Sequence, residues 1–199
     1  MNIRATLAEQ PRPRYLMCNP QHFAVSYSIN PWMDPKAWAE RGDALHATAA
    51  AQWDGLYRAL MRAGAAVELI DPAPGLPDLV FTANAAVVLD GKALLASFRH
   101  AERQGEQPVY AAGFHALKAR GLLGDVVEMP DGVVLEGAGD CLWDARRGLF
   151  WMGSGFRSDP RAAAVVEDCF DVPCVPLDLA DPSFYHLDTA LCPLPCGGV

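Results

Sequence analysis

The sequence predicts an α/β fold built from a repeated module of two strands, a helix and a further strand. Residues 77–98 are expected to form an apolar strand, a polar corner, a second apolar strand, an Asp90-Gly91 turn and a third apolar strand. Asp-Gly between apolar runs is a strong hairpin signal. Residues 132–152 repeat this pattern around a turn at 144–148. Two similar hairpins in succession indicate stacked repeats of one supersecondary unit.

A helix and a strand are expected after each hairpin. The first helix falls within residues 105–120, and Gly121 is its expected C-terminal stop. The second helix begins at about Ser158, with Asp159 as a possible N-cap and Pro160 at the first helical position. The strands expected to follow these helices are 125–129 and 172–175.

An earlier unit fits the same scheme. Residues 22–29 are expected to form a strand, and apolar residues at helical spacing between 45 and 61 predict an amphipathic helix. Gly64 ends that helix, and 66–70 is the next expected strand. At the other end, residues 185–199 open a further copy of the module and stop inside its turn.

The expected whole is three modules and the opening of a fourth, within a single incomplete domain over residues 1–199. Residues 1–13 are expected to be an N-terminal tail. A chain that stops in a hairpin turn leaves an unpaired strand edge, which complete folds avoid. We therefore expect this sequence to be a truncated piece of the fold.

Composition narrows the classes of function. The 199 residues are 51% apolar and carry a net charge of −8, with a pI near 5.0. This acidity argues against nucleic acid or an anionic membrane as a partner and is compatible with a cationic small substrate. The start lacks the apolar core of a signal peptide, and the six cysteines are scattered. A cytoplasmic location is expected because a chain with a normal core needs no disulfides.

Glu136 stands where an apolar strand meets glycines, in the motif Leu-Glu-Gly-Ala-Gly-Asp at 135–140. A carboxylate at the end of a buried strand is costly unless it is paired or used. Gly137 and Gly139 would let the backbone approach a ligand closely. For this segment alone, an acid at the surface end of a strand is an equally good interpretation.

His186 and Asp188 alternate with Leu187, so in a strand they would face the same side. A histidine beside a carboxylate suits proton transfer near neutral pH, although His-x-Asp alone is more often structural. The position of His186 in the repeat favours a site, because Glu136 and Asp78 occupy similar positions. Equivalent positions in stacked modules converge in space.

Further polar residues follow the apolar runs. Asp78 and Asn84 flank one of them and otherwise suit a turn and a loop corner. Arg99 and Arg103 follow the first hairpin, and Arg157 follows the second. Arginines beside a site lined by carboxylates can hold a substrate carboxylate bidentately, but they are more commonly solvated charges. The acids and histidine match no strong metal-ligand spacing, so no metal is expected.

Motifs in a fixed order resemble a known group of enzymes. They lie at 77–84, 135–140, 153–158 and 186–189. Together they resemble the guanidine-modifying enzymes, which include dimethylarginine dimethylaminohydrolase, arginine deiminase, amidinotransferase and arginine dihydrolase. Residues 22–33 resemble one branch of this superfamily, and the likeness spans residues 14–199.

The resemblance implies a pentein-like α/β propeller of five modules, with the active site on its axis. It implies that Glu136 and His186 handle protons and that Asp78 and Asp188 bind the substrate guanidinium. Many members have Asp in place of Asn84, and Asn there resembles the arginine dihydrolase branch. The remaining substrate-binding residues that the resemblance implies are Arg99 and Arg157 at the α-carboxylate, with Asn30 and Phe81.

The chemistry of a guanidinium agrees with these roles. The group is planar and always charged, and its central carbon is a poor electrophile, so a thiolate is the sensible attacker. A bound cation lowers the pKa of the thiol, and a histidine can protonate the departing amine, with no cofactor required. In this superfamily the nucleophilic cysteine lies well beyond the His186 motif. Cys192 and Cys196 do not match it, so we expect this chain itself to be inactive.

The predicted function is a metal-free hydrolase that acts on the guanidino group of arginine or methylated arginine through a Cys-His-Glu mechanism. The longer parent protein would carry the activity. Two alternatives remain open: a non-catalytic module that binds arginine, and an amidinotransferase that passes the amidino group to an amine. The expected partner is a small guanidino compound, and a homo-oligomer is possible.

Overall fold

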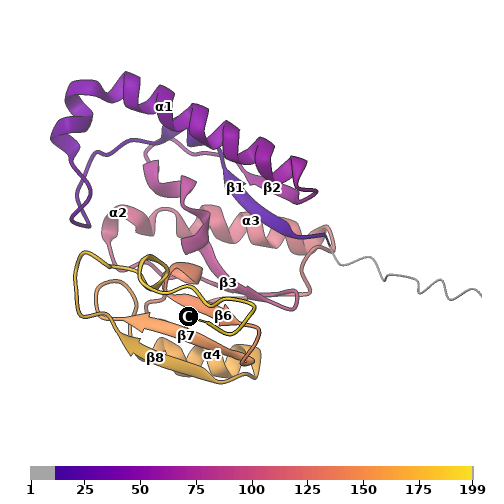
Figure 1. Cartoon of the computed structure of the whole chain (residues 1–199). Helices are drawn as coiled ribbons and strands as arrows, with labels where there is room; N and C mark the ends of the chain where they lie inside the picture. Colours follow the sequence, from indigo (N-terminus) through magenta and orange to yellow (C-terminus); the bar gives the residue numbers. More distant parts are fainter. Residues whose placement is uncertain (1–11, 199) are drawn as a thin grey trace, which may run out of the picture.

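The computed structural model describes residues 12–198 and consists of three small sheets covered by helices. Most of the expected tail at 1–13 lies outside the described residues. Helix α1 (Pro35–Arg62) lies at one end of the molecule, and α4 (Ala162–Phe170) lies at the other, beside the last sheet (Figure 1). Within the described range, no helix combines the length and the apolar character needed to cross a membrane. The α/β class is as predicted.

The first sheet pairs β1 (Arg14–Cys18) with β2 (Ala66–Ile70) in parallel, and α1 connects them. Asp34 caps α1 by accepting a hydrogen bond from the backbone of Ala37. The predicted helix and the strand at 66–70 are confirmed. The predicted strand at 22–29 is wrong, because only a 3₁₀ turn at Pro20–His22 and an irregular loop occupy this region. The alternating apolar side chains there line a cavity instead of a sheet.

The second sheet contains the predicted hairpin. Strands β3 (Ala86–Leu89) and β4 (Lys92–Leu95) pair antiparallel, and β5 (Asp125–Val127) pairs parallel with β4. Asp90 and Gly91 both have positive φ, at 48° and 78°, which suits the tight turn of a twisted hairpin. The helices of this module are α2 (Ala101–Gln104) and α3 (Gln107–Ala119).

The third sheet repeats the arrangement, as the sequence predicts. Strands β6 (Cys141–Asp144) and β7 (Leu149–Ser154) form a hairpin, and β8 (Cys174–Asp178) pairs parallel with β7. Helix α4 begins later than expected. Asp159 and Pro160 form a turn before it, in which Asp159 binds the backbone and guanidinium of Arg161.

Three expected strands are wrong. The runs at 79–83, 133–135 and 185–188 form no strands. The first consists mostly of 3₁₀ turns, and Leu135 makes an isolated bridge to Ser97. The 3₁₀ helices at these places are η2 (Pro77–Val80), η3 (Thr82–Ala85), η4 (Gly137–Gly139) and η5 (Leu187–Thr189). Since η4 contacts both η3 and η5, these segments are packed by contact between modules and not by pairing in a sheet.

Two apolar clusters stabilise this arrangement. One surrounds Tyr110 and Phe114, which α3 presents to the first two sheets. The other surrounds Phe150 and Met152 of β7 and Val166 of α4. Burial of each such large side chain contributes about 1.5–3 kcal/mol. The two clusters hold the ends of the sheets, and hence the 3₁₀ segments, in fixed positions relative to one another.

Candidate active site

A cavity of about 390 Å³ lies where the 3₁₀ segments meet the loop between the 3₁₀ turn η1 (Pro20–His22) and α1. Its walls combine aromatic and aliphatic side chains with acids, amides, arginines and a histidine. The predicted site residues that line it are Asn30, Asp78, Phe81, Asn84, Arg157, His186 and Asp188. Glu136 and Arg99 are not in the lining but contact residues that are. The structure therefore brings the predicted residues to one place.

Glu136 is completely buried, with 0% of its surface exposed, at the N-terminal side of η4. Its Oε2 accepts a hydrogen bond from Arg157 Nη1 at 2.9 Å and lies 3.5 Å from His186 Nε2. Its Oε1 accepts from the backbone of Arg99 at 3.2 Å. A buried carboxylate is tolerated when it is paired and hydrogen-bonded in this way. Glu136 is therefore held as an acceptor directly beside the imidazole.

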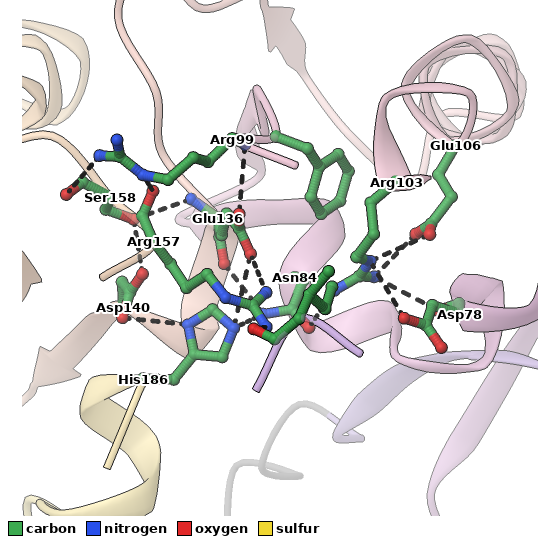
Figure 2. Close-up of polar contacts among 12 residues, drawn as sticks. Asp78, Asn84, Arg99, Arg103, Glu106, Glu136, Asp140, Arg157, Ser158 and His186 are labelled. Atoms are coloured by element: carbon green, nitrogen blue, oxygen red, sulfur yellow. Dashed lines mark hydrogen bonds and ion pairs between the residues drawn. The ribbon is translucent and has the colours of Figure 1, made fainter. Parts of the chain in front are cut away.

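His186 stands between acids on both sides of its ring (Figure 2). Nε2 faces Glu136 and the amide of Asn84, and Nδ1 lies 3.1 Å from Asp140 Oδ1. His186 precedes η5 in extended backbone, so the expected strand is not what brings it to the site. Asp188 is exposed and lines the same cavity, although it no longer shares a strand face with His186.

Asn84 and Arg103 form the second polar group of the site. Asn84 Nδ2 donates to the carbonyl of Glu136 at 3.1 Å, and Asn84 Oδ1 accepts from Arg103 Nη1 at 3.0 Å. Arg103 also makes two hydrogen bonds to Glu106, at 2.9 and 2.7 Å. Figure 2 shows this guanidinium between Glu106 and Asp78. All four side chains are buried.

Asp78 is a buried acid of the cavity, and one of its carboxylate oxygens has no partner among the described residues. The residue is 3% exposed and lines the cavity. Its Oδ2 accepts from the Tyr27 hydroxyl at 2.9 Å and lies 4.0 Å from Arg103 Nε. Its Oδ1 is buried without a hydrogen-bond partner among the described residues. Burial raises the pKa of this carboxyl above its usual range, and Arg103 and Tyr27 only partly offset that effect.

The two predicted carboxylate-binding arginines are placed differently. Arg157 lines the cavity, but its guanidinium donates to Glu136 and to the carbonyl of Ile29 and lies over the ring of Tyr185. Arg99 points away and donates to the carbonyls of Arg157 and Ser158. Arg157 thus ties the loop over the cavity to the buried acid, and Arg99 supports the backbone of the Arg157 segment.

The loop at 23–33 forms the apolar side of the cavity. Phe81 is half-exposed and packs edge-on against Phe23 at 5.8 Å between ring centroids. Trp32 is 71% exposed and donates from its indole to the carbonyl of Ser183. Asn30 accepts from the backbone of Trp32 with its side-chain oxygen. The loop therefore combines an apolar wall with one amide close to the polar residues.

The two glycines of the Glu136 motif are required by close packing. Gly137 has φ of +63°, and a Cβ there would lie 2.6 Å from the backbone of Asn84. A Cβ on Gly139 would lie 2.4 Å from Asn84 Nδ2. Side chains at these positions would displace Asn84. The glycines therefore allow a close approach of the backbone, as the sequence predicts, but the group approached is Asn84 and not a ligand.

Sequence reasoning gave no role to several residues that hold this site. Glu106 follows Arg103 by three positions in the sequence, which is a spacing typical of a helical ion pair and could have revealed it. Asp140 stood inside a recognised motif. No sequence pattern indicated a role for Tyr27, Ser158 or Tyr185, since residues in irregular loops follow no periodic pattern. In the described range, no cluster of three potential ligands has the arrangement of a metal site.

Comparison with known proteins agrees with the resemblance. Residues 12–190 match the family model described as N,N dimethylarginine dimethylhydrolase, eukaryotic. A bifunctional arginine dihydrolase/ornithine cyclodeaminase, AgrE, from Nostoc sp. is 42% identical over 186 residues, which are 94% of this chain and 25% of that protein. The N(G),N(G)-dimethylarginine dimethylaminohydrolase of Mycobacterium tuberculosis is 42% identical over 178 residues, 89% of this chain and 54% of that enzyme.

Solved structures share the fold. The substrate-bound N-terminal domain of ArgZ, an arginine dihydrolase from cyanobacteria, superposes with a TM-score of 0.80 at 39% identity, covering 92% of this chain and 64% of that one. AgrE bound to L-arginine gives a TM-score of 0.82 at 42% identity over 92% of this chain and 26% of that one. The chain spans a quarter of the bifunctional relatives and about half of the Mycobacterium enzyme. By these matches, the chain belongs to the dimethylarginine dimethylaminohydrolase family, within the superfamily of guanidine-modifying enzymes.

Proposed function

We propose that this chain supplies the substrate cavity and the proton-transfer residues of a hydrolase that acts on the guanidino group of arginine or methylated arginine. Asp78 carries the proposal. Its buried Oδ1 has no partner among the described residues and belongs to a side chain that lines the cavity. An unpaired buried carboxylate oxygen is costly, and a cationic N–H donor would satisfy it.

A guanidinium is the cation that fits best. It is flat and offers N–H donors along its edges, so Asp78 and the exposed Asp188 can take donors at different edges. Phe81 and Trp32 supply apolar surface for the methylene chain and for N-methyl groups. A cavity of about 390 Å³ lies within the size range of small-molecule sites.

We assign proton transfer to Glu136 and His186. In the proposed reaction His186 first takes the proton of a cysteine thiol and becomes imidazolium. The thiolate attacks the guanidinium carbon, and a C–S bond forms as the C=N electron pair moves to nitrogen. His186 gives a proton to the departing amine as the C–N bond breaks. The imidazole then takes a proton from water, which attacks the same carbon and releases the thiol. Glu136 stabilises the positive charge that the imidazolium carries before it protonates the amine and after it deprotonates the water.

The nucleophile in this proposal is a thiol other than those of the six cysteines present here. Within residues 12–198, no cysteine lines the cavity. We also propose that the three sheets are modules of an α/β propeller whose axis passes through the cavity. The same observation on the cysteines favours the second candidate, a non-catalytic module that binds arginine.

Calorimetric titration tests the binding part of this function. Arginine and dimethylarginine are expected to bind, whereas lysine, which carries its charge on a compact ammonium, should bind at least tenfold more weakly. Asp78→Asn should remove arginine binding, and Asp54→Asn on the exposed face of α1 should not. Equal binding of lysine and arginine, or an unchanged affinity in Asp78→Asn, would overturn the assignment.

Turnover separates the two candidates. The full-length gene product is incubated with arginine or dimethylarginine, and ammonia, dimethylamine, citrulline and ornithine are measured. Release of these products supports the hydrolase. Binding without any release supports the non-catalytic module.

A further inference from the structure

Asp140 is a buried carboxylate that the proposed reaction does not use. It is 0% exposed and lies between η4 and β6. Its Oδ2 accepts from the hydroxyl of Ser158 at 2.6 Å. Its Oδ1 accepts from the backbone of Leu187 at 3.1 Å and lies 3.1 Å from His186 Nδ1. One oxygen of Asp140 thus faces the ring nitrogen that points away from Glu136.

The other ring nitrogen faces a donor whose identity is fixed by Arg103. A guanidinium has only donors, so the Asn84 atom that Arg103 Nη1 contacts must be the oxygen. The amide nitrogen of Asn84 therefore points to the carbonyl of Glu136 and to His186 Nε2, which lies 3.4 Å away. A donor that faces Nε2 requires a lone pair there.

A neutral imidazole with a lone pair on Nε2 carries its proton on Nδ1. That proton faces Asp140 Oδ1, although the 3.1 Å approach is not aligned as a full hydrogen bond. Nδ1 has no other partner among the described residues. The positions of donors and acceptors around the ring therefore agree on one tautomer.

The competing arrangement places the proton on Nε2, directed at Glu136 Oε2 at 3.5 Å. That oxygen already accepts from Arg157 Nη1 at 2.9 Å, and the amide of Asn84 would then face an N–H. The remaining groups around the ring are Tyr185, at 5.0 Å between ring centroids, and the carboxylate of Asp188. Neither of these offers a reason to prefer Nε2.

We infer that Asp140 is a positioning residue that holds His186 as the Nδ1-protonated tautomer, so that Nε2 is the nitrogen that exchanges protons with a substrate. Its catalytic meaning rests on the proposed function. Ser158 extends the arrangement, because its hydroxyl also accepts from the backbone of Glu136 at 3.0 Å. A single hydroxyl–carboxylate pair thus anchors both proposed proton-transfer residues.

Nitrogen-15 NMR of the ring nitrogens tests the inference on the chain as it stands. The chain has five histidines, and His186→Gln identifies the signals of interest. At alkaline pH, where the ring is neutral, Nδ1 should show the shift of a protonated nitrogen and Nε2 that of an unprotonated one. Asp140→Asn removes the charge that holds the proton and should increase the Nε2-protonated population at least twofold.

Asp144→Asn is the matched control, because Asp144 is buried at the end of β6, the strand that Asp140 directly precedes, and binds Arg147 and Trp151 instead. This variant should leave the tautomer of His186 unchanged. Protonation on Nε2 in the unmodified chain would overturn the inference, even if no variant folds. A tautomer population in Asp140→Asn equal to that of the unmodified chain would also overturn it.

The measurement needs neither ligand nor turnover, so it is independent of the proposed function. If the tautomer is as expected but arginine does not bind, the function fails and the role of Asp140 as a structural holder of the ring stands. If arginine binds and the tautomer differs, the reverse holds. Ser158→Ala should shift the tautomer in the same direction as Asp140→Asn, but less, because the carboxylate keeps its charge.

Discussion

Arg103 donates to Asn84 Oδ1 at 3.0 Å, and this single bond decides which end of the Asn84 amide faces His186. Arg103 is itself fixed by two hydrogen bonds to Glu106, and neither side chain of this pair is accessible to solvent. The orientation of the Asn84 amide is therefore set by a buried ion pair whose arginine also lines the cavity. Each member of this network is buried, so replacing any of them should lower the free energy of unfolding.

Replacing Arg103 should destabilise the fold strongly. Arg103→Met leaves Glu106 buried without its cation, and breaking a buried pair in this way costs about 3–5 kcal/mol. Urea denaturation measures this loss. Arg58→Met removes the cation of an exposed i,i+4 pair on α1 and should cost less than about 0.5 kcal/mol. The double replacement Arg103→Met with Glu106→Leu should recover part of the loss, and no recovery would mean that the ion pair is not the cause.

Asp78→Asn should stabilise the chain at neutral pH and abolish the proposed binding of arginine. Burial raises the pKa of Asp78, so the folded state holds this proton more tightly than the unfolded state does. Stability from this group is present at low pH and is lost as the pH rises through the raised pKa. An amide avoids that loss, so the free energy of unfolding should rise by about 1–2 kcal/mol at neutral pH.

The pH dependence of that gain identifies its cause. In urea denaturation at several pH values, the advantage of Asp78→Asn should vanish below about pH 4, the usual range of an aspartate. Asp144 provides the opposite case. Burial acts to raise its pKa, but hydrogen bonds from Arg147 and Trp151 outweigh burial and lower it. Asp144→Asn should therefore destabilise the chain at neutral pH and do so less in acid.

Tyr27→Phe should weaken arginine binding without removing it. The hydroxyl donates to Asp78 Oδ2 at 2.9 Å and so favours the ionised carboxylate. Loss of this bond should cost about 1 kcal/mol, or roughly fivefold in affinity at neutral pH. Titration calorimetry checks this value, with Tyr57→Phe as the control because Tyr57 stacks on Trp53 of α1. Equal affinities in the two variants would contradict the role given to Tyr27.

Gly137→Ala should cost more than its backbone strain alone. Gly137 and Gly132 both have positive φ, at 63° and 75°, but a Cβ on Gly132 would meet no atom within 4 Å. Gly132→Ala should therefore cost about 1 kcal/mol for the conformation. Gly137→Ala adds a clash with the backbone of Asn84 and should cost at least about 2 kcal/mol more. Equal thermal shifts in the two variants would show that Asn84 moves aside freely.

The parts of the fold that the sequence predicted are those with a local signal. The Asp90-Gly91 hairpin, the hairpin ending in β7 and the strand β2 have turn residues or regular alternation that tertiary context did not change. Helix α1 has an apolar face and a glycine after its end. Such elements follow from hydrogen bonding and burial within a short window of residues.

Apolar runs suit buried strands, so the sequence predicts strands around Leu79, Leu135 and His186. In the structure these runs lie where modules meet, and contacts from other modules bury them without a neighbouring strand. Nothing local distinguishes these two ways of burying a leucine. The predicted strand at 22–29 is wrong for the same reason, since the alternating apolar residues there face a cavity.

The sequence identifies the ionisable residues of the site that stand next to an apolar run, because a charge in that position is unusual. Their partners were harder to find. The pairing of Glu106 with Arg103 has a spacing signal in the sequence, but the approach of Asp140 to His186 appears only in the folded chain. The sequence indicated which residues lie together at the cavity. It did not show that Arg157 and Arg103 form ion pairs with carboxylates of the protein itself.

Asp78, Glu136 and His186 reach the centre of the molecule from three segments that are far apart along the chain. A bound cation that contacts both Asp78 and His186 would connect two segments that are far apart along the chain. Its binding free energy would then add to the work of pulling those parts apart. The free energy of unfolding would then rise with the concentration of this ligand. The lifetime of the folded protein in a cell would depend on that concentration.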